Sequence, residues 1–279
     1  MTVTLFSFFL LLISYFAGIV GALTGLGGGV VLIPALVLIF HVDIHYAMGA
    51  SLISVMATSS GAAIAYLRQG YTNIRIGMFL EVGAVMGALI GAMLVAILPA
   101  NIIAIIFGIV MFISAYLTWQ RKEEKEPTVH SSHFLANYLK LNGHYPTPTG
   151  EKKYYVQHVP LAFSIMTIAG GLSGLLGIGS GALKVLAMDQ AMRLPYKVST
   201  TTSNFIIGIT AAVSAGIYFS HGYIDPALTF PVLMGVLIGA FSGAIILTKL
   251  HNKKLRLIFS IVILLLGLQM IYQGFIGNL

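Results

Sequence analysis

The sequence predicts an all-α polytopic membrane protein made of two inverted repeats, each a glycine-broken helical hairpin followed by three transmembrane helices. Three observations predict this fold. Of the 279 residues, 58% are hydrophobic and only 8% are charged, whereas a soluble domain has about 25% charged residues. The second half of the chain repeats the first half. The cations gather in segments between apolar spans, as the positive-inside rule expects.

The first apolar segment, residues 5–40, is too long for one transmembrane helix, which needs about 20 residues. Its centre holds four glycines, Gly25, Gly27, Gly28 and Gly29. Each would weaken a regular helix by about 1 kcal/mol relative to alanine. Unpaired backbone groups are tolerated in a bilayer only where protein or a wet cavity surrounds them. We therefore expect two helical arms, about 5–24 and 30–40, joined by an unwound turn whose second arm offers N–H groups to an anion.

Three single spans are expected after this hairpin, at residues 46–67, 74–98 and 101–118. A segment rich in lysine, arginine and glutamate follows, and the glycines and prolines in its tail, residues 142–150, indicate turns. The expected domains are a first transmembrane repeat at 1–119, a connecting loop at 120–157 and a second transmembrane repeat at 158–279.

The second repeat aligns with the first by a shift of 152 residues without gaps. The turn glycines Gly25, Gly27 and Gly29 fall on Gly177, Gly179 and Gly181. Among polar residues, Ser51 falls on Ser203 and Thr58 on Thr210. Glycine is abundant here, but a gapless series that preserves the order of glycines and hydroxyls indicates a duplicated unit. It predicts a second hairpin at 158–192 and spans at 198–220, 226–248 and 257–276.

The topology follows from the cations. Fourteen of the 15 lysines and arginines lie in four segments, 68–75, 121–153, 193–197 and 249–256. If these are cytoplasmic, each hairpin starts and ends on one side, so the second repeat is inverted. We expect both termini to be extracytoplasmic and the 121–157 loop to be cytoplasmic, in the cell membrane. The chain then has 8 to 10 spans, depending on whether the hairpins cross fully or are re-entrant.

Rows of small residues occur in both repeats, as Gly83-x-x-x-Gly87-x-x-x-Gly91 and Gly235-x-x-x-Gly239-x-x-x-Gly243. Such rows allow two helices to approach closely in a membrane. We interpret them as packing seams; a substrate path along them is the alternative.

Lys184 is the one cation outside the four basic segments, and it follows the second glycine turn. A lysine inside a membrane costs about 2.5–3.5 kcal/mol on insertion scales. We interpret Lys184 as neutralising an anion; the alternatives are snorkelling or a pair with Asp189. Glu81 lies about two turns into its span and is a candidate for ion coupling, with a snorkelling or capped carboxylate as the alternative.

Hydroxyl and amide side chains near the turns can replace the hydration of an oxyanion, although hydroxyls in helices also bond to their own helix carbonyls. The expected substrate-binding residues are Gly25, Gly27, Gly28, Gly29, Ser51, Gly177, Gly179, Ser180, Gly181, Lys184, Ser203 and Asn204.

The sequence carries no signal for catalysis or a metal. It has no cysteine and no nucleophile or phosphate-binding motif, so we expect no enzyme activity, no cofactor and no metal site. His41, Asp43 and His45 are interpreted as a solvated external turn, with a metal site as the less favoured alternative. The net charge of +7 lies in loops between spans, which does not indicate nucleic-acid binding.

Four motifs resemble the TauE/SafE family, also called the toluene-sulfonate uptake permease family. They are Gly25-Leu-Gly-Gly-Gly-x4-Pro34, Gly177-Ile-Gly-Ser-Gly-Ala-Leu-Lys-Val185, Val198-Ser-Thr-Thr-Thr-Ser-Asn-Phe205 and Gly222-Tyr-Ile-Asp-Pro226. The resemblance covers both repeats. Leu186 and Ser180 depart from it, because the family often has proline and glycine there. Members are known as sulfite or sulfonate exporters, so the resemblance implies transport of small sulfur-containing or related organic anions.

Facing broken helices near the membrane midplane are typical of secondary transporters. The expected function is therefore alternating-access transport of a small anion such as sulfite, an organosulfonate or thiosulfate. The expected driving force is coupling to a proton or a sodium ion, or the gradient of the anion itself. A passive anion channel is the alternative. An intramembrane enzyme or a receptor is a third reading, and the sequence offers no catalytic constellation for it. The expected partners are the anion, the coupling ion and the lipid bilayer.

Overall fold

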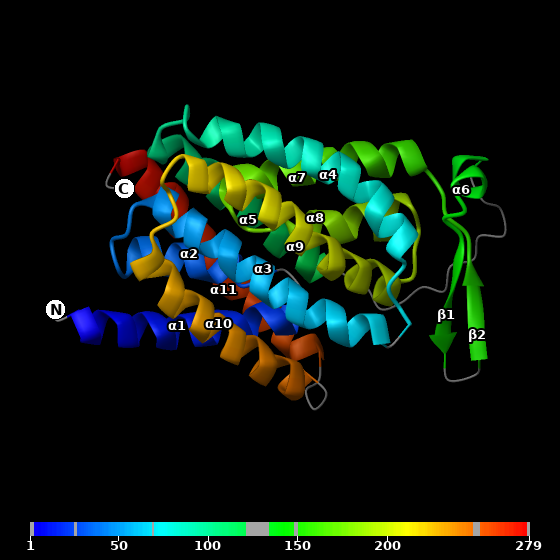
Figure 1. Cartoon of the computed structure of the whole chain (residues 1–279), viewed down its shortest axis with the longest axis horizontal. Helices are drawn as coiled ribbons and strands as arrows, with labels where there is room; N and C mark the ends of the chain where they lie inside the picture. The colour runs from blue at the N-terminus through cyan, green and yellow to red at the C-terminus, as the bar shows by residue number, and fades with distance from the viewer. Residues whose placement is uncertain are drawn as a thin grey trace.

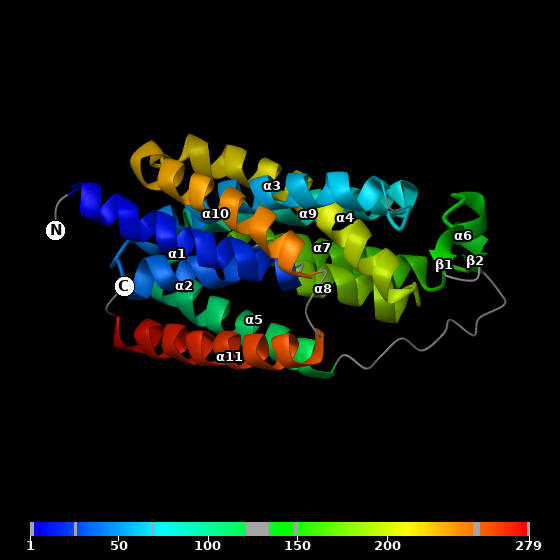
Figure 2. The ribbon, with the colours of Figure 1, turned by 90° about the horizontal axis from the view of Figure 1, so that it is seen from below.

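The computed structural model describes residues 3–24, 27–68, 70–120, 134–147, 150–247 and 252–277. Most of these residues are helical, and the long helices run along one axis of the molecule (Figures 1 and 2). Six described helices are long and apolar enough to cross a membrane: α1 (Val3–Thr24), α4 (Ile74–Val95), α5 (Ala100–Gln120), α7 (Val159–Leu176), α9 (Tyr196–Ser220) and α10 (Pro226–Leu247). The predicted all-α polytopic membrane fold is confirmed.

Both predicted hairpins form around a glycine break. In the first, α1 is followed by α2 (Gly29–Leu38). In the second, α7 is followed by α8 (Gly181–Leu186), which continues into a π-helical turn, η1 (Ala187–Ala191). The remaining long helices, α3 (Ile44–Arg68) and α11 (Asn252–Ile276), have 25 residues each and lie alongside the six membrane-length helices. The single spans begin within five residues of their expected positions.

The two halves pack against each other reciprocally. Helix α1 packs on α10 and α4 packs on α7, and these pairs exchange under the 152-residue shift. Helix α1 begins at the end of the molecule away from the β-strands, whereas α7 begins at the end beside them (Figures 1 and 2). Helix α11 also ends at the end away from the strands. This arrangement supports the interpretation of two inverted repeats.

The connecting segment contains structure that the sequence analysis did not predict. After the short helix α6 (Phe134–Tyr138), strands β1 (Gly143–Thr147) and β2 (Gly150–Tyr154) form an antiparallel hairpin in which Gly143 pairs with Tyr154. The prediction of turns across 142–150 was therefore wrong for β1. Glycine and proline dominated the local signal, but tyrosine and threonine favour strands, and the Tyr145 and Tyr154 rings lie 6.2 Å apart.

Asn73 ties this β-hairpin to the helices. Its Nδ2 donates to the Tyr154 hydroxyl at 2.6 Å and to the Leu141 carbonyl at 3.2 Å. Its Oδ1 accepts from the Ile76 amide and caps α4, and its own amide donates to the Thr202 hydroxyl on α9. Burial raises the pKa of the Tyr154 phenol above its ordinary value. The β-hairpin is thus fixed to the end of the bundle where α4 begins.

The glycine rows are packing seams, as predicted. A Cβ at Gly87 would overlap the backbone carbonyl of Thr167 on α7, and a Cβ at Gly239 would overlap that of Tyr15 on α1. Gly91 and Gly235 make similar contacts with carbonyls of the facing helix. Glycine lets these helix backbones touch, which is the principal way that helices associate without a hydrophobic driving force.

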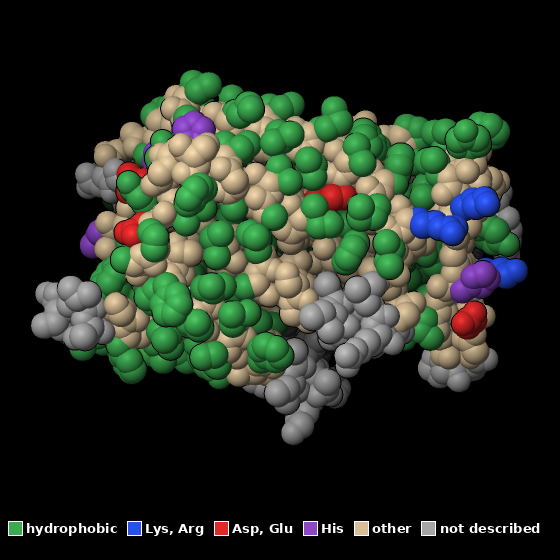
Figure 3. Space-filling view, viewed as in Figure 1, with side chains coloured by type: hydrophobic (Ala, Val, Ile, Leu, Met, Phe, Trp, Pro, Cys, Tyr) green, Lys and Arg blue, Asp and Glu red, His purple; other side chains and the backbone are tan. Residues whose placement is uncertain are grey.

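The outer surface has the pattern of a membrane protein. Figure 3 shows hydrophobic side chains spread along the length of the visible face, with the visible lysine and arginine side chains at the end that carries the β-hairpin. Large apolar residues such as Phe16, Met86 and Phe241 are exposed. Their exposure matches a surface covered by lipid, because a soluble monomer rarely exposes a large continuous apolar patch.

The seams give a stability prediction. Gly87→Ala and Gly239→Ala should each destabilise the protein by about 1–3 kcal/mol, because the added methyl group overlaps a helix backbone that cannot move freely. Gly216→Ala on α9 is the control, since an added Cβ there meets nothing within 4 Å. Thermal unfolding of the three purified variants in detergent checks this. Equal unfolding temperatures for all three would contradict the seam assignment.

Candidate functional site

The two glycine turns meet at the centre of the molecule. A Cβ at Gly29 would lie 3.2 Å from the Gly177 carbonyl oxygen and would overlap the Ser51 hydroxyl. Ser51 Oγ, on α3, donates to the Gly177 carbonyl at 2.7 Å. A hydroxyl of the first repeat therefore provides a hydrogen bond to the backbone carbonyl at the end of α7, in the second repeat. Most predicted site residues come together here; Gly25 lies outside the described residues.

The second turn has an unusual backbone. Gly177, Gly179 and Ser180 have φ of 67°, 74° and 47°, in the left-handed region. Glycine adopts this conformation readily, whereas a serine there is strained by roughly 1–2 kcal/mol. The buried Ser180 hydroxyl has no hydrogen-bond partner among the described residues, and Ser203 Oγ donates to the Gly181 carbonyl at 3.4 Å.

The structure describes residues 27 and 28 of the first turn. Gly27 has φ of 82° and faces the Val55 side chain. Gly28 is buried against the Ala17 carbonyl of α1, so a side chain there would press α2 away from α1. The turn is thus enclosed by α1 and α3, which supply the protein surroundings that an unwound segment needs in a membrane.

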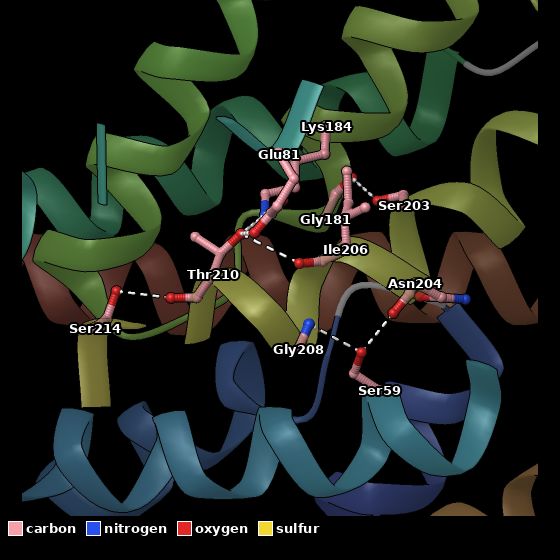
Figure 4. Close-up of polar contacts among 10 residues, drawn as sticks. All are labelled: Ser59, Glu81, Gly181, Lys184, Ser203, Asn204, Ile206, Gly208, Thr210 and Ser214. Carbon is pink, nitrogen blue, oxygen red and sulfur yellow. Dashed lines mark hydrogen bonds and ion pairs between the residues drawn. The ribbon is translucent and has the colours of Figure 1, made fainter. Parts of the chain in front are cut away.

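A buried ion pair joins the two halves of the chain (Figure 4). Lys184 on α8 is fully buried, and its Nζ lies 3.7 Å from Glu81 Oε2 on α4. Lys184 also donates to the Thr210 hydroxyl on α9, and that hydroxyl donates to Glu81 Oε1 at 2.6 Å. The three side chains come from three helices and form one cluster. Glu81 Oε2 has no hydrogen-bond partner among the described residues.

The Glu81 carboxylate offsets the buried charge of Lys184. The sequence offered an anion, snorkelling or Asp189, and the structure places Glu81 there. Lys184 and Glu81 were each singled out, but their contact was not predicted. Removing one partner of such a pair leaves an uncompensated buried charge, which is strongly destabilising. Because α8 has only six residues, the Lys184 ammonium rather than a long helix dipole supplies the positive charge.

The ion pair breaks the symmetry of the repeats. Under the 152-residue shift, Lys184 corresponds to Leu32 and Glu81 corresponds to Leu233, whereas Thr210 corresponds to Thr58. The first turn therefore has a hydroxyl at the matching position but apolar side chains in place of the two charges. The centre of the molecule has one charged side and one neutral side.

A small cavity of about 20 Å³ lies on the neutral side, beside the first turn. Its lining includes Gly27, the hydroxyl residues Thr58 and Ser59 on α3, and Asn204 on α9. Ser59 Oγ donates to the backbone carbonyl of Asn204 at 2.5 Å and accepts from the Gly208 amide at 2.9 Å. Asn204 is buried, and its side-chain amide forms no hydrogen bond to the described residues. The cavity has room for about one water molecule.

Three polar residues of this centre were not predicted: Thr58, Ser59 and Thr210. The signal for two of them was present, because Thr58 and Thr210 align in the repeat. Thr58 and Thr210 recur at the same place in both copies, as Ser51 and Ser203 do, so the repeat gave the same signal for all four residues. Ser59 has alanine at its matching position, Ala211, so the repeat gave no signal for it.

A second polar cluster lies at the other end of the bundle from the β-hairpin. Asp43 accepts from the His45 amide at 2.8 Å and contacts its ring at 2.8 Å, and the His45 ring stacks on Tyr223 at 4.9 Å. Within the described ranges, no group of three or more His, Cys, Asp or Glu side chains is placed to hold a metal ion.

These observations define a multi-pass membrane protein whose polar centre lies between two glycine-broken hairpins. Residues 10–270 match the protein family described as Sulfite exporter TauE/SafE, and the chain belongs to this family. Membership and the packing of the long apolar helices together identify a membrane transporter.

Known relatives agree with this class. The chain is 29% identical to the probable membrane transporter protein YunE of Bacillus subtilis (strain 168), over 95% of this chain and 97% of the relative. It is 28% identical to the probable membrane transporter protein YdhB of the same organism, over 84% and 88%. It is 25% identical to the probable membrane transporter protein YjnA of the same organism, over 94% of this chain and 98% of the relative. No solved structure matches the chain.

The ion pair predicts a strong coupling between two substitutions. Lys184→Met alone should destabilise the protein by about 3–5 kcal/mol, because it leaves the Glu81 carboxylate buried without its partner. Adding Glu81→Gln should restore much of that loss. Unfolding of wild type, both single variants and the double variant gives the coupling free energy.

Leu32→Met is the matched control, since Leu32 occupies the equivalent buried position in the first repeat and such swaps usually cost less than about 1.5 kcal/mol. Additive effects of Lys184→Met and Glu81→Gln would show that the two side chains do not interact.

Proposed function

We propose that the protein is a secondary transporter that moves a small anion across the cell membrane by alternating access. The anion is sulfite, an organosulfonate, thiosulfate or a related organic anion, held near the midplane between the two broken hairpins. The observation that carries this proposal is the buried Lys184 ammonium on α8, the helix that directly follows the second glycine turn. An ionisable side chain inside a membrane protein marks a substrate or ion pathway in most cases.

Competition with Glu81 makes binding of the anion to Lys184 reversible. The 3.7 Å separation of Nζ and Oε2 is an ion pair without a direct hydrogen bond. An anion that approaches Nζ competes with the Glu81 carboxylate for the same charge. Protonation or displacement of Glu81 therefore exposes the ammonium to substrate, and return of the carboxylate expels it. This competition is the basis for proposing Glu81 as a coupling residue.

The remaining predicted residues are proposed to take part in the same site. Ser51 and Ser203 now donate to turn carbonyls, and each can rotate to donate to an oxyanion instead. We propose them as substrate contacts, with the backbone of Gly177, Gly179, Ser180 and Gly181. The first-turn residues Gly25, Gly27, Gly28 and Gly29 and the amide of Asn204 are proposed to close the site on its neutral side, without direct contact with the anion. Contact between Gly29 and Gly177 closes the centre, which supports alternating access over an open channel.

The direct test is uptake of radiolabelled sulfite, thiosulfate and an organosulfonate into proteoliposomes. Lys184→Met should weaken anion affinity about tenfold to a hundredfold, the effect of one lost charged contact. Lys184→Arg should retain part of the anion affinity, because arginine keeps the positive charge but carries it on a group of different shape. Leu32→Met should transport as wild type does.

Unchanged affinity in Lys184→Met would refute the proposed site. Exchange of internal for external labelled anion, faster than net flux, distinguishes a transporter from the channel alternative. A channel would instead give currents that far exceed the rate of exchange.

We also propose that both termini are extracytoplasmic and that the β-hairpin faces the cytoplasm, because the visible lysine and arginine side chains lie at its end of the bundle. The chain has no cysteine, so single cysteines can be introduced without background. In intact cells, an impermeant thiol reagent should label Asp225→Cys and should label Glu151→Cys only after lysis. Labelling of Glu151→Cys in intact cells would reverse the topology.

A further inference from the structure

The two glycine turns have different chemistry around them. In Figure 4, the Glu81–Lys184–Thr210 cluster lies toward α4 and α8, whereas the Ser59–Asn204 contacts lie between α9 and α3. The first group contains a full positive and a full negative charge. The second group borders the 20 Å³ cavity and contains only neutral oxygen and nitrogen atoms. The two sides therefore suit different ligands.

Size excludes the transported anion from the cavity. About 20 Å³ of cavity space holds one water molecule or one monatomic ion. An oxyanion with four or more heavy atoms does not fit without movement of α3 or α9. The cavity ligand is thus a separate species from the substrate.

The available acceptors indicate a cation. Thr58 Oγ1 uses its one hydrogen on the carbonyls of Ser54 at 3.1 Å or Val55 at 3.0 Å, so its lone pairs stay available. The Asn204 amide has an oxygen that forms no hydrogen bond to the described residues, and Ser59 Oγ has a second lone pair beside the one that Gly208 uses. The last turn of α1, at Gly21, also lines the cavity, and a helix C-terminus carries partial negative charge.

The absence of charged side chains among the described lining residues favours a monovalent ion over a divalent one. Among the described residues that line the cavity, none has a carboxylate or a basic side chain. These residues are Gly21, Ala22, Gly27, Thr58, Ser59, Asn204 and Ile207. Dedicated divalent sites use carboxylates, whereas hydroxyl, amide and carbonyl oxygens alone suit a monovalent hard cation. In transporters with broken helices, unwound carbonyls and helix C-terminal ends coordinate such ions.

We infer that the cavity beside Gly27 binds one Na⁺ ion through Thr58, Asn204 and Ser59, and that this ion is the coupling ion. Binding of Na⁺ does not depend on the proposed function; only its role in coupling does. An Na⁺ on the neutral side would offset the charge of an anion that displaces Glu81 on the other side. The two glycine turns would then hold ligands of opposite sign across α9.

The test measures Na⁺ binding before transport. Thermal unfolding of the purified protein is followed against rising NaCl, with choline chloride keeping the ionic strength constant and KCl in parallel. We expect saturable stabilisation by Na⁺ and not by K⁺. Thr58→Val, nearly isosteric with the original side chain, should weaken apparent Na⁺ affinity about tenfold through loss of one ligand oxygen. Ser60→Ala is the control, since that exposed hydroxyl on α3 bonds to the Met56 carbonyl of its own helix and is not among the residues that line the cavity.

A second variant keeps the inference testable if Thr58→Val does not fold. Asn204→Asp places a carboxylate at the same position and should strengthen the Na⁺-dependent stabilisation. Equal unfolding temperatures in Na⁺, K⁺ and choline would overturn the inference and leave a water site. The same response of wild type and Thr58→Val would overturn the assignment to this cavity.

Transport assays separate the two proposals. Anion uptake that an inward Na⁺ gradient accelerates, and that Thr58→Val makes independent of Na⁺, supports the coupling role. Saturable Na⁺ binding without anion uptake would leave the site in place and refute the transport proposal. Anion uptake that is independent of Na⁺ would refute coupling through this cavity and leave the transport proposal in place.

Discussion

The structure depends on the contact between the two unwound glycine turns. A backbone that leaves the helix inside a bilayer must be surrounded by protein, because lipid offers no hydrogen bonds. Each turn obtains part of these surroundings from the other half of the chain: Gly29 lies against Gly177, and Ser51 donates to the Gly177 carbonyl. The glycine seams that hold α1 on α10 and α4 on α7 bring the halves close enough for this contact. The contact between the two turns forms only when both halves are in place.

The duplicated architecture carries an asymmetric chemistry. Both halves supply a glycine turn and a threonine, but only one matching position has the Lys184–Glu81 pair. A symmetric scaffold gives two related conformations that open to opposite sides, which alternating access requires. In the proposed mechanism, the unequal side chains let one turn attract an anion while the other offers neutral oxygens. The charges cross the boundary between the halves, so movement of α4 relative to α8 changes the strength of the pair.

The sequence predicted much of the fold because membrane helices have strong local signals. The apolar spans, the glycine breaks and the repeat placed most of the long helices within a few residues. The β-hairpin at 143–154 was missed because its prolines and glycines outweighed a weak strand preference. Lys184 and Glu81 were recognised as unusual charges, but they are 103 positions apart in the numbering. Only the packing of α4 and α8 on α9 brings the two charges together, with Thr210 between them.

The most direct test of this account is an experimental structure of the protein with thiosulfate bound. The account predicts density for the anion within hydrogen-bond distance of Lys184 Nζ, with the Glu81 carboxylate moved away from the ammonium. It also predicts that the Ser51 or Ser203 hydroxyl has turned toward the anion. Thiosulfate bound elsewhere, with the Lys184–Glu81 pair intact, would contradict the central claim that this ion pair and the substrate compete for one site.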